Sequence, residues 1–457
     1  MSGPKAFRIV TRAEIISICR RNLARLDAAV EIWISACKRN GTIDQSDIDR
    51  VIARRDEIRR MLDADRFTDL QKQVIAEISY LKTDTERRAE KAAESEAKRK
   101  GDQRRAKSAA QALLEKFESS RIEIPVDLRR ELTTPAASVE SLNKAVSKGL
   151  MLLQPADRSD GVTERQRALA DRLDAGDRRI TLEEWTSQQI GASDDQALLK
   201  VDKLLGELAG LGIEPSPFSA RIAALEAEPR ARRALVADSL LLDLSAAIKT
   251  GRERARLERD LAERHAELSE MKSAEAAALR IEIERAIARS SVNDQELVQR
   301  ANLLIEAEVR SMAAEERRRA VLEGLASLGY EVSEGMMTAW VAGGRVVLRK
   351  PANPGYGVEL SGGGSQADIM QVRAVGIGNP TDARDAGRDK DMETIWCSEF
   401  GRLQSLVAKA GGSVSIESAR PVGQFPLKVV PDLGVAATDS DSAITHHGDR
   451  TGRAADL

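Results

Sequence analysis

The stretch TRAEIISICRRNLARLDAAVEIWISACK, Thr11–Lys38, decides the fold class through its spacing of apolar residues. Mostly apolar positions recur at alternating steps of four and three, which is the heptad spacing of helices that pack side by side. These positions are Ile15, Cys19, Asn22, Leu26, Ala29, Trp33 and Ala36. A second line at steps of seven consists of Ile16, Leu23, Val30 and Cys37. A face this broad predicts a helix that contacts two neighbours, as in a bundle.

A short turn follows this helix. Gly41 can end it in the left-handed conformation, and Asp44 or Ser46 can cap a second helix, so an antiparallel hairpin is expected. The second helix is predicted to continue to Phe117, within an N-terminal region of residues 1–118. Residues 82–112 contain no Val, Ile, Leu, Met, Phe, Trp or Tyr. Such a segment favours helix but has little to bury, which predicts a long exposed helical arm or a partly disordered one.

The run KRKGDQRRAK, Lys98–Lys107, places six basic residues and one acidic residue in this arm. Clustered cations can contact phosphates, so the run is a candidate nucleic-acid-binding patch. No aromatic side chain interleaves for base stacking, and acidic residues flank the run, so a solvated helix face is the alternative. The candidate binding residues are Lys98, Arg99, Lys100, Arg104 and Arg105.

Two regions separate the arm from the C-terminal part of the chain. Proline and glycine interrupt residues 119–192, which predicts an irregular connector with short helices. Helical periodicity returns over residues 193–314. Ala234–Ile248 is apolar on most sides, and the leucines that follow form only a narrow apolar stripe. We expect a helical bundle followed by a coiled-coil segment there.

The stretch EVSEGMMTAWVAGGRVVLRKPANPGYGVEL, residues 331–360, marks a change from helical spacing to a period of two. Residues 337–341 and 345–350 flank the glycines of a predicted hairpin turn, and residues 356–360 and 370–375 alternate as further strands. A helical stripe and a last short strand follow. Residues 315–430 are therefore predicted to form a small α+β domain in which a helix covers an antiparallel sheet. The polar residues 431–457 are predicted to be disordered. The expected fold class is thus mostly α, with long antiparallel helices or coiled coil before a small C-terminal α+β domain.

Three arginines are expected on the strands of this domain or at their turns. Arg345 lies at the predicted hairpin, and Arg349 and Arg373 lie on strands with one wet face. Guanidinium groups bind carboxylates and phosphates in a two-pronged geometry, so these residues are candidate binding residues. Ordinary surface charge is the alternative interpretation.

The residues do not indicate catalysis. Of three histidines, two lie in the polar tail and one in a charged helix, so Cys397 lacks a histidine partner. The glycine-rich stretch SGGGSQAD has no Gly-Lys-Ser/Thr ending, which argues against a phosphate loop. Carboxylates remain as possible magnesium ligands, and the alternative is helix-end acids in water. The acidic residues in question are Glu359, Asp389, Asp391, Glu393 and Glu399. We therefore predict no catalytic residue, no metal and no cofactor.

The composition limits which partners and which cellular compartment are expected. The net charge is −2, so the whole chain has no general affinity for nucleic acid or an anionic membrane. Three cysteines without a repeating pattern argue against a disulfide framework and for a reducing cytoplasm. No segment has the length and apolar character of a signal peptide or a membrane span.

The first functional hypothesis is a structural interaction protein, not an enzyme, whose coiled-coil arms position a binding head and which associates with itself or a protein partner. The layout is similar to that of bacterial coiled-coil proteins that work beside separately encoded ATPases or effectors, which implies a bacterial multi-protein assembly. Two alternatives are a nucleic-acid-associated factor that uses the basic arm or the head arginines, and a carboxylate- or metal-dependent enzyme in the head.

Overall fold

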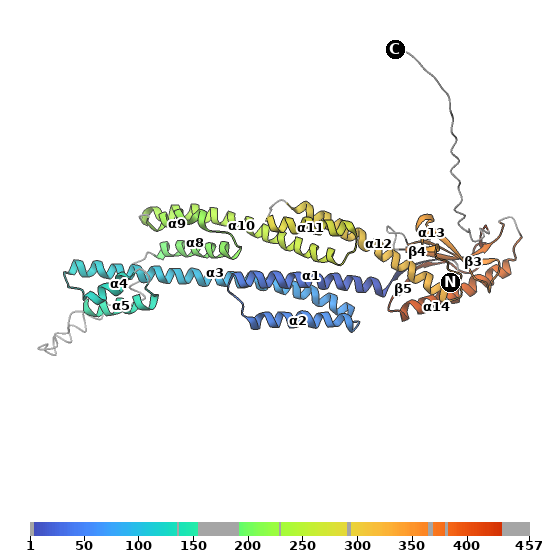
Figure 1. The fold of residues 1–457 in the computed structure, drawn as a ribbon, viewed down its shortest axis with the longest axis horizontal. Helices are drawn as coiled ribbons and strands as arrows, with labels where there is room; N and C mark the ends of the chain where they lie inside the picture. The colour runs from blue at the N-terminus through green and yellow to red at the C-terminus, as the bar shows by residue number, and fades with distance from the viewer. Residues whose placement is uncertain are drawn as a thin grey trace, which may run out of the picture. The chain divides into compact units, whose positions relative to one another are not determined.

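The computed structural model describes residues 4–134, 137–153, 192–227, 230–289, 294–363, 369–379 and 383–431. It divides into two compact units: the helical unit, Ile18–Ile305, and the α+β unit, which combines Met1–Ser17 with Glu306–Leu457 (Figure 1). Within the described residues there are 12 helices and a six-stranded sheet, so the predicted fold class is confirmed. Most of the predicted connector, and nearly all of the tail predicted to be disordered, lie outside the described residues.

The helical unit begins with three antiparallel helices. These are α1 (Arg12–Arg39), which starts in the α+β unit, α2 (Gln45–Asp63) and α3 (Phe67–Ser120). Both predicted lines of α1 supply buried residues, namely Cys19, Leu23, Leu26, Val30, Trp33 and Cys37. Asp44 caps α2 by accepting a hydrogen bond from the amide of Asp47 at 2.8 Å. The prediction of one helix from residue 46 to residue 117 is wrong, because Asp65 adopts a left-handed φ of 55° and separates α2 from α3.

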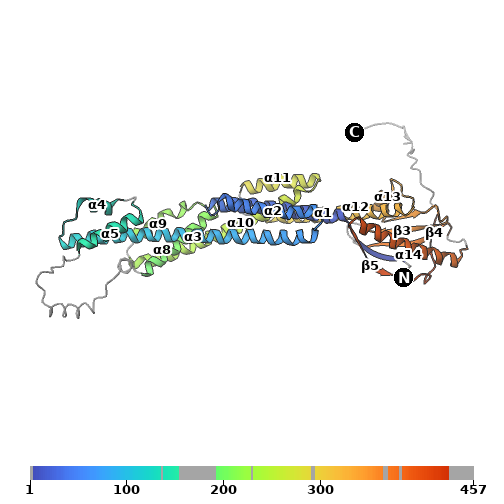
Figure 2. The same ribbon diagram turned by 90° about the horizontal axis from the view of Figure 1, so that it is seen from below.

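One face of the alanine-rich part of α3 is buried, in contrast to the predicted exposed arm. It packs along α8 (Ala192–Gly210), as Figure 2 shows. Ala93 and Gly101 lie at the contact, beside Gly206 and Leu199 of α8. A Cβ atom built on Gly206 of α8 would lie only 2.9 Å from the Cα atom of Ala93. The two backbones therefore approach closely because the facing side chains are small or absent. Small residues on α3 thus bury this face, against Gly206 and the side chain of Leu199 on α8.

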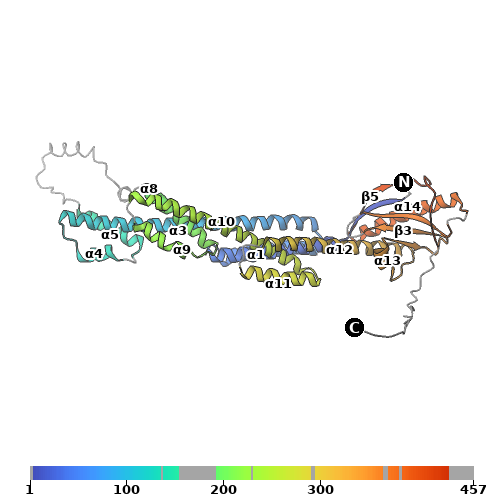
Figure 3. The same ribbon diagram turned by 90° about the horizontal axis from the view of Figure 1, so that it is seen from above.

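The remaining helices of this unit pack as two groups. α4 (Val126–Thr133) and α5 (Val139–Leu153) cover the C-terminal part of α3, as Figure 1 shows. α9 (Ser216–Ala227) and the long α10 (Arg230–Ser269) share an apolar cluster with α8. α11 (Ala274–Arg289) then folds back along α10 (Figure 3). Long antiparallel helices therefore account for the described part of this unit.

The α+β unit has a sheet in the order β2-β3-β4-β1-β5, with β6 paired to β4. The strands are β1 (Lys5–Val10), β2 (Arg345–Arg349), β3 (Tyr356–Gly362), β4 (Ile369–Ile377), β5 (Ser413–Ala419) and β6 (Lys428–Val430). All pairings on the main path are antiparallel, whereas β6 runs parallel to β4. The strand β1 was not predicted, although it lies between β4 and β5. It joins the sheet from more than 300 residues away in sequence.

The predicted strand over residues 337–341 is wrong, because this segment forms the helix α13 (Met336–Gly343). Met336, Met337 and Trp340 reach the apolar core at helical spacing. The indole of Trp340 donates a hydrogen bond of 3.0 Å to the carbonyl oxygen of Gly362. A short apolar run is compatible with the spacing of a helix or of a strand. Here the burial of Trp340 in the core stabilises the helix.

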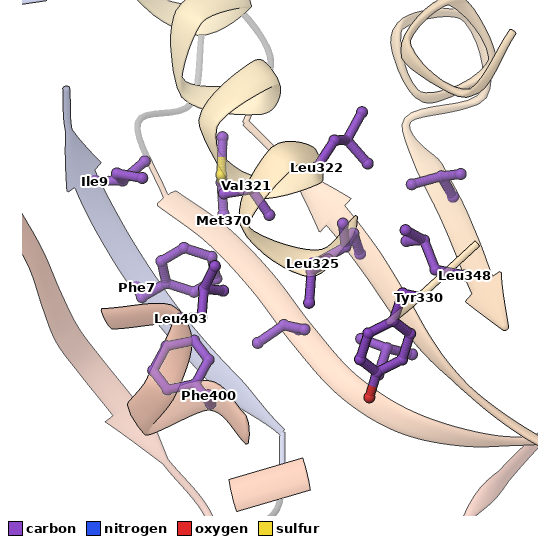
Figure 4. Close-up of a cluster of buried hydrophobic side chains, with 14 of the residues drawn as sticks. Phe7, Ile9, Val321, Leu322, Leu325, Tyr330, Leu348, Met370, Phe400 and Leu403 are labelled. Atoms are coloured by element: carbon purple, nitrogen blue, oxygen red, sulfur yellow. The ribbon is translucent and has the colours of Figure 1, made fainter. Parts of the chain in front are cut away.

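One face of the sheet is covered by helices. The C-terminal part of α12 (Gln295–Ser327) and α14 (Ala386–Lys409) pack on it. Figure 4 shows residues of both helices against inward-facing side chains of β1, β2 and β4. The labelled core residues are Phe7, Ile9, Val321, Leu322, Leu325, Tyr330, Leu348, Met370, Phe400 and Leu403. No helix in the described part of the chain covers the opposite face, which we call the open face.

Candidate functional site

The open face carries the strand positions that alternate with the core. Strand register places Glu359 of β3 directly opposite Arg373 of β4 and opposite Val347 of β2. Arg345 and Arg349 occupy the two ends of β2 on the same face, so the three predicted arginines share this surface. The structure thereby brings together the candidate residues of the α+β unit. Arg8 of β1 and Lys428 of β6 were not predicted and also belong to it.

Glu359 is the centre of this face. It is only 2% exposed and accepts hydrogen bonds from Lys428 Nζ at 2.7 Å and from Arg373 Nε at 2.5 Å. Burial raises the pKa of Glu359, but the hydrogen bonds from Lys428 and Arg373 outweigh it, so the pKa is lowered from its ordinary value. An ionised Glu359 therefore holds the two cations in fixed positions while they remain partly exposed.

The open face has an excess of positive charge. Arg345 has a 66% exposed side chain and lies 4.0 Å from Glu359, and the Arg373 side chain is 40% exposed. Arg8 pairs with Glu417 at 3.2 Å, and both side chains are about half exposed. Four strand cations, Arg8, Arg345, Arg373 and Lys428, share two carboxylates, Glu359 and Glu417, which leaves two positive charges. Exposed, pre-positioned guanidinium groups can bind an anionic surface.

The basic run of α3 has a different environment. Arg99 pairs with Glu96 at 2.6 Å and Arg105 pairs with Asp102 at 2.5 Å, both along the same helix. Arg104 pairs with the buried Asp202 of α8 and so contributes to helix packing. Lys98 is exposed and Lys100 is half-buried. Three of the five candidates are thus engaged in ion pairs within the helical unit.

The carboxylates of the α+β unit have separate partners. Asp389 accepts hydrogen bonds from the Tyr356 hydroxyl at 2.8 Å and from Arg384 at 3.0 Å. Glu399 accepts one from the Tyr330 hydroxyl at 2.6 Å and also pairs with Lys350. In addition, Glu393 accepts a hydrogen bond from the amide of Gly423. Across the described ranges, no three His, Cys, Asp or Glu side chains are grouped in a way that could hold a metal ion.

A cleft of about 830 Å³ lies within the helical unit between α1, α2, α10 and α11. Its wall contains His265, whose Nε2 lies 2.9 Å from a carboxylate oxygen of Glu284. Arg59 and Asp27 form a second pair there at 2.6 Å. These polar groups pair with one another, while alanine and leucine side chains contribute much of the floor. The cleft therefore offers no convergent set of chemical groups.

The two open-face cations that were not predicted, Arg8 and Lys428, differ in how far the local sequence indicates them. Phe7 and Ile9 alternate with Arg8, so period-two spacing could have indicated β1. Lys428 lies in a strand of only three residues, and its neighbour Glu359 is 69 residues away in sequence. That pairing depends on sheet register and has no local signal.

Comparison with protein-family models, curated proteins and solved structures gives no match for this chain. Among the helices that the structure describes, none combines the length and apolar character that crossing a membrane requires. Function is therefore argued from the open face and from the helical unit.

Proposed function

We propose that this chain is a structural interaction protein whose α+β unit binds the acidic surface of a protein partner through the open face. The observation that supports this function is the positive excess on a sheet face that no described helix covers. Arg345 and Arg373 present guanidinium groups there, and the buried Glu359 fixes the position of Arg373. Such complementarity sets orientation and association rate.

The helical unit suits a scaffold role because ion pairs fix how its helices align. Arg25 of α1 pairs with Glu263 of α10 at 2.8 Å. The buried Asp84 of α3 accepts a hydrogen bond of 3.0 Å from the Trp33 indole of α1. Polar groups of this kind specify register more than they add stability. We propose self-association through this unit within a bacterial, cytoplasmic multi-protein assembly, which sedimentation velocity of the full chain would detect as a concentration-dependent dimer.

Site-specific photo-crosslinking tests the partner hypothesis. A photoreactive residue at Gln371, which is exposed on the open face, should crosslink one discrete protein in the native cell. The matched control is the exposed Ala408 on α14, where that product should be absent. Adding Arg345→Glu to the Gln371 variant should abolish the product. Equal yields at both positions, or a yield that charge reversal leaves unchanged, would reject the open face as the binding surface.

The second candidate is a nucleic-acid-associated factor, which the same exposed arginines and Lys98 favour. If the chain binds phosphates, the logarithm of its binding constant should fall linearly with the logarithm of the salt concentration. Replacing Arg345 with Ala should reduce that slope by about one if it contacts one phosphate. Salt-independent binding, or no binding at low salt, would leave the protein partner as the working function.

A further inference from the structure

Lys5 is an unusual residue for the core of the α+β unit. It lies on β1 opposite Val372, on the helix-covered face, and is only 3% exposed. Its Nζ atom lies 3.2 Å from the Sγ atom of Cys397 and 4.7 Å from the centroid of the Phe400 ring, both on α14. No carboxylate of the described residues lies within ion-pair distance of this Nζ. The hydrogen-bond acceptor of the buried amine is therefore a cysteine sulfur.

This pairing activates one of its two members. A buried ammonium is unfavourable without a counter-charge, and the Phe400 ring supplies only part of the compensation. A positive charge beside sulfur favours the thiolate, which is the reactive form of cysteine. The Cys397 sulfur is therefore the nucleophile that the pairing favours.

The other cysteines of the chain lack this environment. Cys19 and Cys37 are buried in the helical unit, and burial raises the pKa of each thiol. Cys397 is partly exposed, whereas the other two cysteines are buried, so it is the cysteine most accessible to a small oxidant. Reactivity of a thiol requires both thiolate character and access. The chain thus contains two internal controls for the reactivity of Cys397.

We propose that Lys5 and Cys397 form an oxidative modification site at which a peroxide-class oxidant links the two side chains covalently. The Cys397 thiolate attacks a peroxide oxygen, and the O–O bond breaks to give the sulfenic acid and hydroxide. The hydroxide takes a proton from the Lys5 ammonium, which forms water and leaves Lys5 as the free amine. The lone pair of Lys5 Nζ then attacks Sγ, which forms an N–S bond and displaces hydroxide. The hydroxide takes a proton from nitrogen and leaves as water. Each link removes two hydrogen atoms from the protein and produces two waters from hydrogen peroxide.

The link would join β1 to α14, which are 392 residues apart in sequence and adjacent in the α+β unit. A thiol reductant reverses it by attacking Sγ, which releases the Lys5 amine and leaves a mixed disulfide. A second thiol then restores Cys397. The site is therefore a reversible covalent clamp on β1, an interior strand of the sheet.

Peptide mapping of the full chain after treatment with hydrogen peroxide tests the proposal. The expected product is a Lys5 peptide joined to the Cys397 peptide, with a mass two hydrogens below their sum, that disappears after incubation with dithiothreitol. Cys397 should react at least about tenfold faster than Cys19 and Cys37. Lys5→Met, which keeps an apolar side chain of similar length, should give no link and let Cys397 proceed to the irreversible sulfinic acid.

Near-ultraviolet circular dichroism establishes that each variant retains a packed α+β unit. Should Lys5→Met fail to fold, Cys397→Ser serves instead and should remove the product. Two outcomes would overturn the proposal: oxidation of wild-type Cys397 straight to sulfinic acid without a Lys5 link, or equal reaction rates at the three cysteines.

Discussion

Substituting Gly206 with Ala tests whether the alanine-rich part of α3 is buried against α8. A Cβ atom at this position would lie 2.9 Å from the Cα atom and 3.0 Å from the Cβ atom of Ala93. The nearer atom belongs to backbone, so the contact cannot be relieved by a change of rotamer. The two helices must separate, or the local backbone must shift.

Two opposing terms set the expected size of the effect. Replacing glycine with alanine inside a helix stabilises it by about 1 kcal/mol. Overpacking at a close helix contact costs about 1–3 kcal/mol. We therefore expect Gly206→Ala to lower the free energy of unfolding by about 1 kcal/mol. If this part of α3 were exposed, Gly206→Ala would instead raise the free energy of unfolding, because only the gain in helix propensity would remain.

Gly401 is the matched control, because it lies inside α14 and a Cβ atom there meets open space. Gly401→Ala should therefore stabilise its own unit by about 1 kcal/mol. The assay is urea unfolding followed by circular dichroism, with hydrogen exchange of peptides around Ala93 to assign the change to α3. Slower exchange around Ala93 in Gly206→Ala, together with a gain in stability equal to that of the control, would refute the packing described for α3 and α8.

Three further predictions concern buried polar groups. Asp84→Asn should destabilise the helical unit by roughly 1.5–3 kcal/mol, because hydrogen bonds to a charged acceptor are lost, as urea unfolding would reveal. The pKa of Glu359 is lowered from 4.5, so its ionised form stabilises the α+β unit above pH 4.5. That stabilisation should disappear as the pH falls below this value, and Glu359→Gln should remove this part of the pH dependence of unfolding. Tyr330→Phe should lower the free energy of unfolding by about 1–3 kcal/mol, because it removes a buried hydrogen-bond donor to Glu399. Unfolding followed by Trp396 fluorescence measures this change, since Trp396 contacts the Tyr330 ring. An unchanged stability would show that Lys350 alone satisfies this carboxylate.

The heptad spacing of α1 was sufficient to predict its buried face. Leu23 and Leu26 belong to different predicted lines, and both are buried, as a helix with two neighbours requires. The same reasoning failed for α3, because it counted large apolar side chains as the source of burial. Ala93 is buried by a glycine on another helix, and no property of its own neighbourhood indicates that partner.

The open face shows a similar division between local and distant information. Period-two spacing correctly placed Arg349 and Arg373 on strands, since the alternation is a property of each segment alone. It could not place Glu359 opposite Arg373, because strand register depends on the intervening turn and on the core. For the same reason the spacing gave no indication that Lys428 completes the set of cations around Glu359.

The position of β1 links the two ends of the chain in folding as well as in structure. This strand pairs with both β4 and β5, so without it the sheet would leave two strand edges unpaired. Its partners follow it by more than 300 residues, and the whole helical unit lies between them. Contacts of such long range form slowly, whereas hairpins such as α1–α2 and α10–α11 depend on local contacts. The helical unit can therefore fold first, and the sheet closes only when Phe7 and Ile9 reach the strands that bury them.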